Sequence, residues 1–437
     1  MSRPLRTCSW RLWPAALCLA ALCLLGPAAR SAELRGHGGP VRAIDVTTDG
    51  RSAITGGFDT SAIIWSLASG EARQVLRFHE SQVNAVAALP DGRFATAGAD
   101  GRIAIWEEVT GAPVRELSGH SAPVAALAVS PDGATLASAA WDTTVRLWPL
   151  AGGAARVLEG HSGNVNGVAF MADGTLASAG YDATVRFWPP SVEAPPRVFT
   201  LPSPLNALVA LKDGALAVGG ADGRVRVLDR DGTVRAETEV APTPVIALAA
   251  SRDGRHLAAA GLQGAVALLD AETLRLVHNL VGPGLPVWSL AFVADGRTIL
   301  TGGSDRVVRS WNVETGEHEG AIATGPADPL AAFEGDPGAQ VFGACVACHT
   351  LTPDEGNRAG PTLAGIFGRR IASLPGYHFS EALKELDIVW TPETVAKLFE
   401  VGPATYTPGT KMPEQTIGSA KDREALVRFL EKATHPQ

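Results

Sequence analysis

The feature that most constrains the fold of this 437-residue chain is an internal repeat. Seven Asp-Gly pairs, the first at Asp49 and the last at Asp295, recur about every 41 residues. Asp-Gly suits a tight hairpin, because glycine adopts positive φ without strain and aspartate tolerates it. The residue that closes the third β-type run of each unit recurs in a second register: Trp65, Trp106, Trp148, Trp188, Leu228, Leu269 and Trp311. The two registers agree on seven units between residues 34 and 322.

The repeat resembles the WD40 family, whose units carry a Gly-His pair, an Asp before the third strand and a Trp at its end. Three units show the whole pattern: Gly36-His37, Asp59 and Trp65; Gly119-His120, Asp142 and Trp148; and Gly160-His161, Asp182 and Trp188. The fifth and sixth units lack both the His and the Trp. The resemblance implies an all-β propeller of seven four-stranded blades over residues 33–322. It also implies that the repeated His and Asp hydrogen-bond within their blades rather than bind a metal.

Closure of the ring is the part of this propeller that the repeat does not fix. We expect the strand near Glu33–Arg35 to pair with the last blade. The Glu317–Ala323 run could compete for the same place, and the sequence does not choose between the two.

The first 32 residues have the pattern of a secretory leader. A basic start precedes the apolar run Ala15–Leu25, and small residues follow it. The run has eleven residues, about half of the ~20 that a transmembrane helix needs, which argues against a membrane anchor. Cleavage after Ala29 or after Ala32 fits equally well. We therefore expect an exported protein, in a Gram-negative periplasm or otherwise secreted, with no membrane span after leader cleavage.

Charge and cysteine content narrow the function further. The net charge is −8, and no Lys/Arg cluster of the kind that binds phosphate backbones occurs, so we expect no nucleic-acid partner. Three of the five cysteines lie in the leader. Removal of the leader would leave only Cys345 and Cys348, which are too close together to suggest an ordinary structural disulfide framework.

These two cysteines belong to the pentapeptide Cys345-Val346-Ala347-Cys348-His349. Two thiols at this spacing can add to the two vinyl groups of one haem, and the following His then lies under the iron. Half of a zinc site would need two more ligands at matching spacing, and the sequence has no second cysteine pair. A redox dithiol would normally follow a strand in a βαβ unit, which is absent here. The motif therefore predicts one covalently bound haem c.

The segment around the motif resembles class I cytochrome c of the mitochondrial and c2 type. After a Pro/Gly-rich linker over residues 323–335, residues 336–437 carry the blocks of that family in order: Gly360-Pro361-Thr362-Leu363, Gly365-Ile366-Phe367-Gly368-Arg369, Pro375-Gly376-Tyr377, Trp390, and Tyr406-Thr407-Pro408-Gly409-Thr410-Lys411-Met412. The implied fold is all-α, with helices opening near Gly338, after Thr391 and near Lys421.

The resemblance also assigns roles to individual residues. Cys345 and Cys348 would form the thioethers, and His349 and Met412 would be the axial ligands of the iron. The second ring nitrogen of His349 would donate to the carbonyl of Pro361. Two further residues would hydrogen-bond a haem propionate: Arg369 and Trp390.

Several of these assignments have plainer alternatives. Met412 could be a core filler, as most methionines are, but its Pro-Gly-Thr-Lys approach favours ligation. His378 is an alternative sixth ligand, although it belongs to the propionate-side loop. Trp390 could be ordinary core. The chain also departs from the family at Phe379 and Phe399, where a Tyr is common, and from residue 331 onward ten Lys and Arg face thirteen Asp and Glu, so no basic docking ring is expected.

The leading hypothesis for function is an electron carrier whose haem passes single electrons and whose propeller docks redox partner proteins. The alternatives are a multidomain oxidoreductase, whose propeller holds a substrate site fed by the cytochrome, and a haem-linked scaffold or sensor. The propeller offers no evident ligand set for a second haem or for copper, and Met412 would block the open iron position that a peroxidase needs. We therefore favour the carrier over an enzyme.

Overall fold

A computed structural model of the chain describes residues 33–319 and 330–434, apart from residues 109, 191–193, 283–284, 344, 347, 353–359, 376, 378, 411 and 413–414. The leader expected over residues 1–32 lies outside the described residues. So do residues 323–329 of the expected linker and His378.

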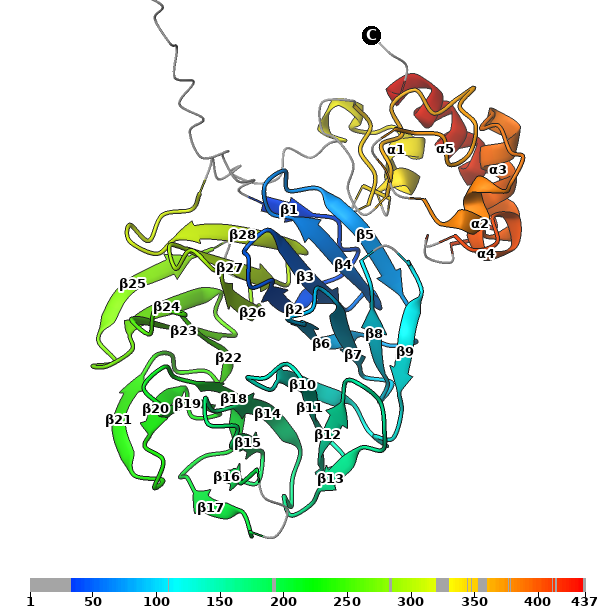
Figure 1. The fold of residues 1–437 in the computed structure, drawn as a ribbon. Helices are drawn as coiled ribbons and strands as arrows, with labels where there is room; N and C mark the ends of the chain where they lie inside the picture. Colours follow the sequence, from blue (N-terminus) through cyan, green and yellow to red (C-terminus); the bar gives the residue numbers. More distant parts are fainter. Residues whose placement is uncertain are drawn as a thin grey trace, which may run out of the picture.

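The first part of the chain is a ring of seven four-stranded antiparallel sheets, counted over the described residues (Figure 1). The first strand of each sheet faces the centre of the ring, where it contacts the first strands of the two neighbouring sheets. The seven-bladed propeller expected from the repeat is confirmed.

The first four blades follow one another in chain order. Their strands are β2 (Val41–Val46), β3 (Ser52–Gly57), β4 (Ser61–Ser66) and β5 (Ala72–Arg77); β6 (Val83–Ala88), β7 (Phe94–Gly98), β8 (Ile103–Trp106) and β9 (Pro113–Leu117); β10 (Val124–Val129), β11 (Thr135–Ala140), β12 (Val145–Pro149) and β13 (Arg156–Leu158); and β14 (Val165–Phe170), β15 (Leu176–Gly180), β16 (Thr184–Trp188) and β17 (Arg197–Thr200).

The remaining three blades complete the ring. Their strands are β18 (Leu205–Ala210), β19 (Leu216–Gly220), β20 (Arg224–Leu228) and β21 (Val234–Glu239); β22 (Val245–Ala250), β23 (His256–Gly261), β24 (Ala265–Asp270) and β25 (Leu276–Val281); and β26 (Val287–Phe292), β27 (Thr298–Gly303) and β28 (Val307–Asn312), to which β1 (Glu33–Arg35) adds the fourth strand.

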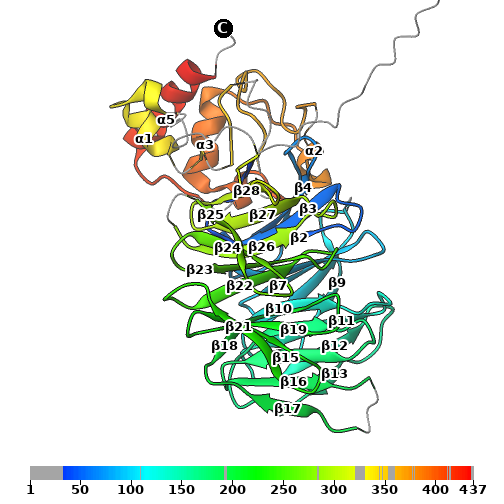
Figure 2. The ribbon, with the colours of Figure 1, turned by 90° about the vertical axis from the view of Figure 1, so that its left-hand side faces the viewer.

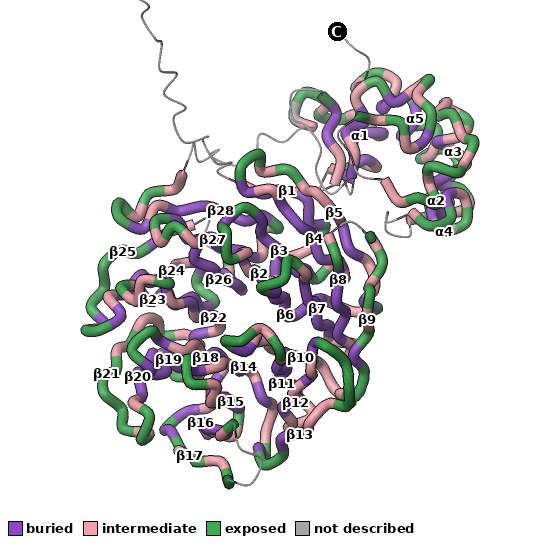
Figure 3. Tube along the Cα trace, viewed as in Figure 1, coloured by how far each residue is buried: buried purple, intermediate pink, exposed green. Residues whose placement is uncertain are grey.

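The burial pattern explains why these runs form strands of one ring. The second strand of a blade is covered on both faces, so β3 is buried along its whole length. Strands at the rim alternate instead, as β21 does between exposed and half-buried residues (Figure 3). The packed interior of the propeller therefore lies between neighbouring blades, and the turns lie outside it.

The ring is closed by the strand that the sequence indicated. β1 pairs antiparallel with β28, with Leu34 opposite Val308, and Leu34 is 2% exposed. The segment after β28 does not displace it. His318 forms a β-bridge with Trp311, and the Glu319 amide donates to the Ser310 carbonyl. The two segments thus share the outer edge of β28 rather than compete for it.

Four blades contain the same buried chain of hydrogen bonds. In the third blade the Asp142 carboxylate is 2.8 Å from His120 Nδ1, His120 Nε2 is 2.7 Å from Ser138 Oγ, and Trp148 Nε1 donates to Ser138 Oγ at 2.8 Å. A neutral imidazole with its proton on Nδ1 satisfies every group in this chain. The corresponding sets begin at His37, His79 and His161.

Two of the blades that lack this pattern use a different polar group. In the fifth blade Arg226, 3% exposed, bonds to Asp222 at 2.6 Å and to Glu237 at 2.5 Å. In the seventh blade Arg309 pairs with Asp305 in the same i, i+4 relation. In these two blades an Arg–Asp ion pair thus replaces the Asp–His pair of the other four.

The C-terminal part is a small helical domain, as the sequence indicated. Its elements are η1 (Ala331–Phe333), α1 (Pro337–Phe342), α2 (Glu381–Lys384), α3 (Pro392–Val401), α4 (Pro403–Tyr406) and α5 (Ala420–Ala433). The Thr391 hydroxyl caps α3 by accepting from the Thr394 amide. α1 and α5 cross closely, since a Cβ on Gly338 would lie 2.1 Å from the Ala425 carbonyl oxygen. None of the described helices is long and apolar enough to span a membrane.

The helical domain sits beside the rim of the ring, next to β1 and β5 (Figures 1 and 2). Cys348 connects the two parts directly. Its Sγ lies 3.4 Å from the Gly36 carbonyl oxygen, and its side chain packs against the apolar core of the first blade.

Candidate cofactor site

The helical domain surrounds a cavity lined mainly by apolar side chains from α1, α2, α3 and α5, together with the loops between the helices. About 1250 Å³ between these side chains holds no protein atom, a volume that includes the mouth of the cavity. Pockets that bind small molecules and cofactors are typically roughly 300–1,000 Å³ and mostly apolar. Cys345, Cys348, His349 and Met412 all line it, with the further residues described below.

The two cysteines and the histidine share one turn that follows α1. The amide of Cys348 and the amide of His349 both donate to the Cys345 carbonyl, at 3.0 and 2.9 Å. This turn brings all three side chains to the same wall of the cavity. Burial raises the pKa of the Cys345 thiol to about 12. A redox dithiol of the thioredoxin kind needs a lowered thiol pKa, so the environment does not support that reading.

The His349 ring is held in one orientation. Its Nδ1 lies 2.8 Å from the Pro361 carbonyl oxygen, so Nδ1 carries the proton and donates it, and Nε2 keeps its lone pair. Gly360 packs flat against the ring, because a Cβ there would lie 2.4 Å from His349 Cε1. In the sequence Gly360 is recognisable only as part of the block Gly360–Leu363, and nothing in that block indicates its contact with the His349 ring.

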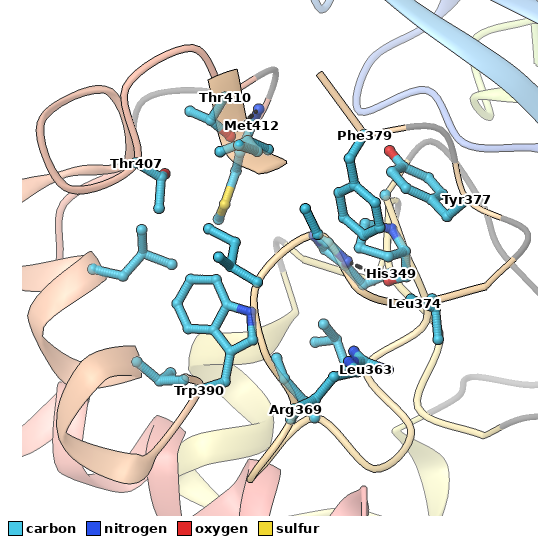
Figure 4. Close-up of a pocket in the computed structure, with 18 of the residues that line it drawn as sticks. His349, Leu363, Arg369, Leu374, Tyr377, Phe379, Trp390, Thr407, Thr410 and Met412 are labelled. Atoms are coloured by element: carbon cyan, nitrogen blue, oxygen red, sulfur yellow. Dashed lines mark hydrogen bonds between the residues drawn. The ribbon is translucent and has the colours of Figure 1, made fainter. Parts of the chain in front are cut away.

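Met412 reaches the cavity from the loop that follows α4. Its amide donates to Thr410 Oγ1 at 3.1 Å, and Thr407 anchors the start of the loop by donating to the Pro403 carbonyl at 2.9 Å. Figure 4 shows the Met412 sulfur pointing into the cavity, with His349 on another side of it. Lys411, which precedes Met412, lies outside the described residues.

Arg369 and Trp390 lie together at one end of the cavity (Figure 4). Their backbones pair, since the Trp390 amide donates to the Arg369 carbonyl at 2.9 Å. The Arg369 guanidinium donates to the carbonyls of Thr362 and Ala364, at 2.8 and 3.2 Å. Burial lowers its pKa, and none of the described residues supplies a carboxylate partner. A desolvated cation without a counter-ion suits a ligand that carries a carboxylate.

The loop before α2 supplies an aromatic wall. Tyr377 and Phe379 both line the cavity, with their ring centroids 4.7 Å apart. Phe379 brings no hydroxyl, as the sequence indicated, whereas Tyr377 carries one. Burial raises the pKa of Tyr377, so it stays protonated at neutral pH.

One lining residue comes from the propeller. Arg77, the last residue of β5, is part of the cavity wall, on the side where Cys348 meets the first blade. The sequence gave no sign of it, because nothing in the repeat indicates which blade the helical domain contacts.

Comparison with known proteins agrees with this geometry. The family model for cytochrome c matches residues 335–434. Cytochrome c of Cochliobolus lunatus is 43% identical over 90 residues, which are 21% of this chain and 82% of that protein. Cytochrome c of Arabidopsis thaliana is 43% identical over 90 residues, 21% of this chain and 80% of that protein. The chain belongs to the cytochrome c family.

The cytochrome c domain is only part of the match. Cytochrome c2 of Blastochloris viridis is 39% identical over 104 residues, 24% of this chain and 81% of that protein. The model for the WD domain, G-beta repeat, matches residues 29–66, 70–107, 111–149, 152–189 and 274–312. The stretch between the last two matches contains the fifth blade and all of the sixth except β25, and both blades lack the Asp–His–Ser–Trp chain. The chain therefore consists of a WD40 propeller followed by a cytochrome c domain.

Membership of the cytochrome c family implies haem with iron, and the residues present fit such a group. The cavity is mainly apolar, is lined by both cysteines, His349 and the thioether of Met412, and contains the Arg369 guanidinium, for which none of the described residues supplies a carboxylate. A second metal site would need other ligands. Over the described residues, no three His, Cys, Asp or Glu side chains come together in a way that could hold an ion.

Proposed function

We propose that this protein is an exported electron carrier, with one covalently bound haem c in the cytochrome c domain and a propeller that docks redox partner proteins. The observation that carries the proposal is the common cavity of His349 and Met412, with Cys345 and Cys348 on the His349 wall. His349 and Met412 would hold the iron of such a group and leave no open position for a substrate, and the group would supply one-electron redox chemistry, which suits electron transfer rather than substrate binding.

The residues around the cavity would each serve that task. Cys345 and Cys348 would tether the group through thioethers, and the Pro361 carbonyl would fix the His349 ring with Nε2 directed at the iron. Arg369, with Trp390 beside it, would neutralise a propionate. Apolar side chains would exclude water from the rest of the group.

The role of the propeller rests on its fold and its surface. WD40 propellers serve as interaction platforms, but fold alone does not name a partner. We place the protein in a Gram-negative periplasm because of the leader pattern in residues 1–32. Cell fractionation with antibody detection checks this placement, and recovery of the full-length chain in the cytoplasm would contradict it.

The ligand assignment is tested by absorption spectroscopy of the oxidised protein. Ligation of Fe(III) by methionine gives a weak charge-transfer band, which we expect in the wild type and not in Met412→Ala. Met171→Leu is the matched control, because Met171 is buried in the propeller and far from the cavity. Persistence of the band in Met412→Ala would rule out Met412 as the ligand.

The number of redox groups separates the carrier from the oxidoreductase. Iron analysis should give one iron per chain, and mass spectrometry of the denatured chain should show the haem still attached. More than one iron per chain, or any copper, would favour a substrate site in the propeller.

A further inference from the structure

The haem cavity is not built by the cytochrome c domain alone. The first blade covers it where Cys348 lies, with Cys348 Sγ 3.4 Å from the Gly36 carbonyl oxygen. Arg77 reaches the cavity wall from the end of β5, and Cys348 and Tyr377 are close enough to interact electrostatically with its charge. A cationic side chain of the propeller thus faces the cofactor site of the other domain (Figure 1 shows β5 beside that domain).

Arg77 has no evident task inside its own blade. It pairs with Ser61 in the β4–β5 register, and the fourth, fifth and sixth blades place Thr200, Glu239 and Val281 at the equivalent position. A residue that the repeat required would recur there. The arginine is therefore a feature of this blade, which is the blade that meets the cytochrome c domain.

The guanidinium of Arg77 is poorly compensated. Its Nε is buried without a hydrogen-bond partner. The carboxylate whose charge acts on Arg77, that of Asp59, is already bonded to His37 Nδ1, the Gly38 amide and the Ser61 hydroxyl. Burial lowers the pKa of Arg77, which nevertheless stays charged, because an arginine does not lose its proton in a protein. A fixed positive charge therefore lies in a wall that is otherwise mainly apolar.

We propose that Arg77 is a positioning and tuning residue of the haem site: it closes the cavity at the Cys348 edge and raises the midpoint potential of the haem. The inference rests on the proposed electron-transfer function. Reduction adds one electron and so removes one positive charge at the iron. A nearby cation in a medium of low dielectric constant favours the reduced form. The propeller would in this way set the driving force of electron transfer as well as the docking partner.

The test is a spectroelectrochemical titration of the full-length, haem-loaded protein. In Arg77→Met we expect the ratio of reduced to oxidised haem at a fixed applied potential to fall about threefold to tenfold; a tenfold fall corresponds to about 59 mV for one electron. Arg77→Lys keeps the charge and should retain most of the wild-type potential. Because the charge is buried, the difference should persist at high salt, where surface charges are screened.

Arg224→Met is the matched control. Arg224 is also a propeller arginine, but it opens β20 in the fifth blade, is paired with Glu237 and Glu239, and does not line the cavity. Its replacement should leave the potential unchanged. An unchanged potential in Arg77→Met, or an equal shift in Arg224→Met, would overturn the inference.

The outcomes separate this inference from the function on which it rests. A wild-type protein without a one-electron haem wave and without the methionine band would refute the proposed function itself. A normal wild-type wave that Arg77→Met does not move would refute only the role of Arg77. If Arg77→Met does not fold, as judged by urea unfolding, Arg77→Gln and Arg77→Lys compare a neutral with a charged side chain at the same position.

Discussion

At the residue scale, the cofactor site depends on a glycine, Gly360, which has no side chain. Gly360 leaves room for the His349 ring, whose Nδ1 donates to the Pro361 carbonyl. A histidine ligand with such a partner is oriented and made more basic. The lack of a side chain at Gly360 therefore helps to set the orientation and basicity of His349, eleven positions earlier.

Gly360→Ala should disturb this arrangement. The new Cβ would lie 2.4 Å from His349 Cε1, so the ring must shift and its hydrogen bond to Pro361 must weaken. We expect the domain to lose about 1–3 kcal/mol of unfolding free energy, and the midpoint potential to rise because the ligand becomes less basic. Urea unfolding followed by haem absorption measures the first effect, and a redox titration the second. Gly418→Ala is the control, since no atom lies within 4 Å of its added Cβ; equal behaviour of the two variants would contradict the role of Gly360.

How far the sequence could predict the site follows from the distances involved along the chain. Cys345, Cys348 and His349 lie within five consecutive positions, and Met412 stands in a recognisable loop. Local sequence pattern was therefore enough to indicate these four residues as candidates for the site. Arg77 precedes them by more than 260 positions, and its place in the wall depends on how two domains pack. Tertiary packing of that kind leaves no local pattern, which is why the sequence could not indicate it.

At the scale of single elements, the blades owe part of their stability to buried hydrogen-bond chains. Repeat spacing was sufficient to predict the blades, including the fifth and sixth. It did not predict that Arg226 would occupy the place of the missing histidine in the fifth blade, because Arg226 is in an ordinary strand position in the sequence.

The buried Asp–His hydrogen bonds of the blades predict that the propeller is less stable in acid. In the third blade, burial lowers the pKa of His120, and the hydrogen bond to Asp142 offsets this only in part. Burial also opposes ionisation of Asp142, but the hydrogen bonds that Asp142 accepts from Thr144 and His120 outweigh the burial and lower the pKa of Asp142. Both groups bind protons more readily when unfolded. Stability should therefore be complete above the unfolded histidine pKa of about 6.5, fall as pH drops below it, and fall again below about pH 4 as the carboxylate protonates.

Urea unfolding followed by tryptophan fluorescence between pH 8 and pH 5 checks this expectation. His120→Asn should be less stable at pH 8 and should show a smaller loss on acidification. His278→Asn is the control, because His278 lies outside the four chains and bonds only to the Glu314 carbonyl among the described contacts. An identical pH slope in wild type and His120→Asn would argue against the histidine as a source of the acid sensitivity.

The crossing of α1 and α5 gives a second element-scale prediction. Gly338→Ala would place a Cβ 2.1 Å from the Ala425 carbonyl and 2.5 Å from Phe429 Cβ, so the helices must move apart. The change should cost the cytochrome c domain about 1–3 kcal/mol, as overpacking typically does. Thermal unfolding followed at the haem band measures it, and Gly282→Ala, whose added Cβ would lie at an ordinary 3.6 Å from the Gly264 carbonyl oxygen in the propeller, should have little effect. No change in the unfolding midpoint would mean that the helices cross less tightly than described.

At the scale of the whole molecule, one short strand holds the ring closed and also lies next to the domain contact. Leu34 in β1 is buried against the first and last blades, in the same apolar cluster on which Cys348 packs. The sequence indicated the partner of this strand, since a repeat that begins in mid-blade leaves one strand over. It could not show that a second segment, through His318, would share the same edge.

Leu34→Ala should therefore weaken the ring as a whole. Loss of a buried leucine side chain costs about 2–5 kcal/mol, and the added cost should appear as faster hydrogen exchange in β28 and β1. Leu276→Ala is the control, because Leu276 is 61% exposed on β25. Exchange that accelerates equally in all blades, or in none, would show that β1 is not the closing element.

The position of β1 also imposes an order of assembly. The chain is made from its N-terminus, so Glu33–Arg35 emerges before the other propeller strands, yet its partner β28 is the last described propeller strand to appear. Until then the strand waits with an open edge, and Gly36, against which Cys348 rests, has no fixed place. The surface that the cytochrome c domain contacts at Gly36 is thus complete only after β1 has paired with β28 and closed the ring. Maturation of the haem domain against the propeller becomes a final step, and a chain that stalls before the seventh blade has nothing for its C-terminal domain to dock on.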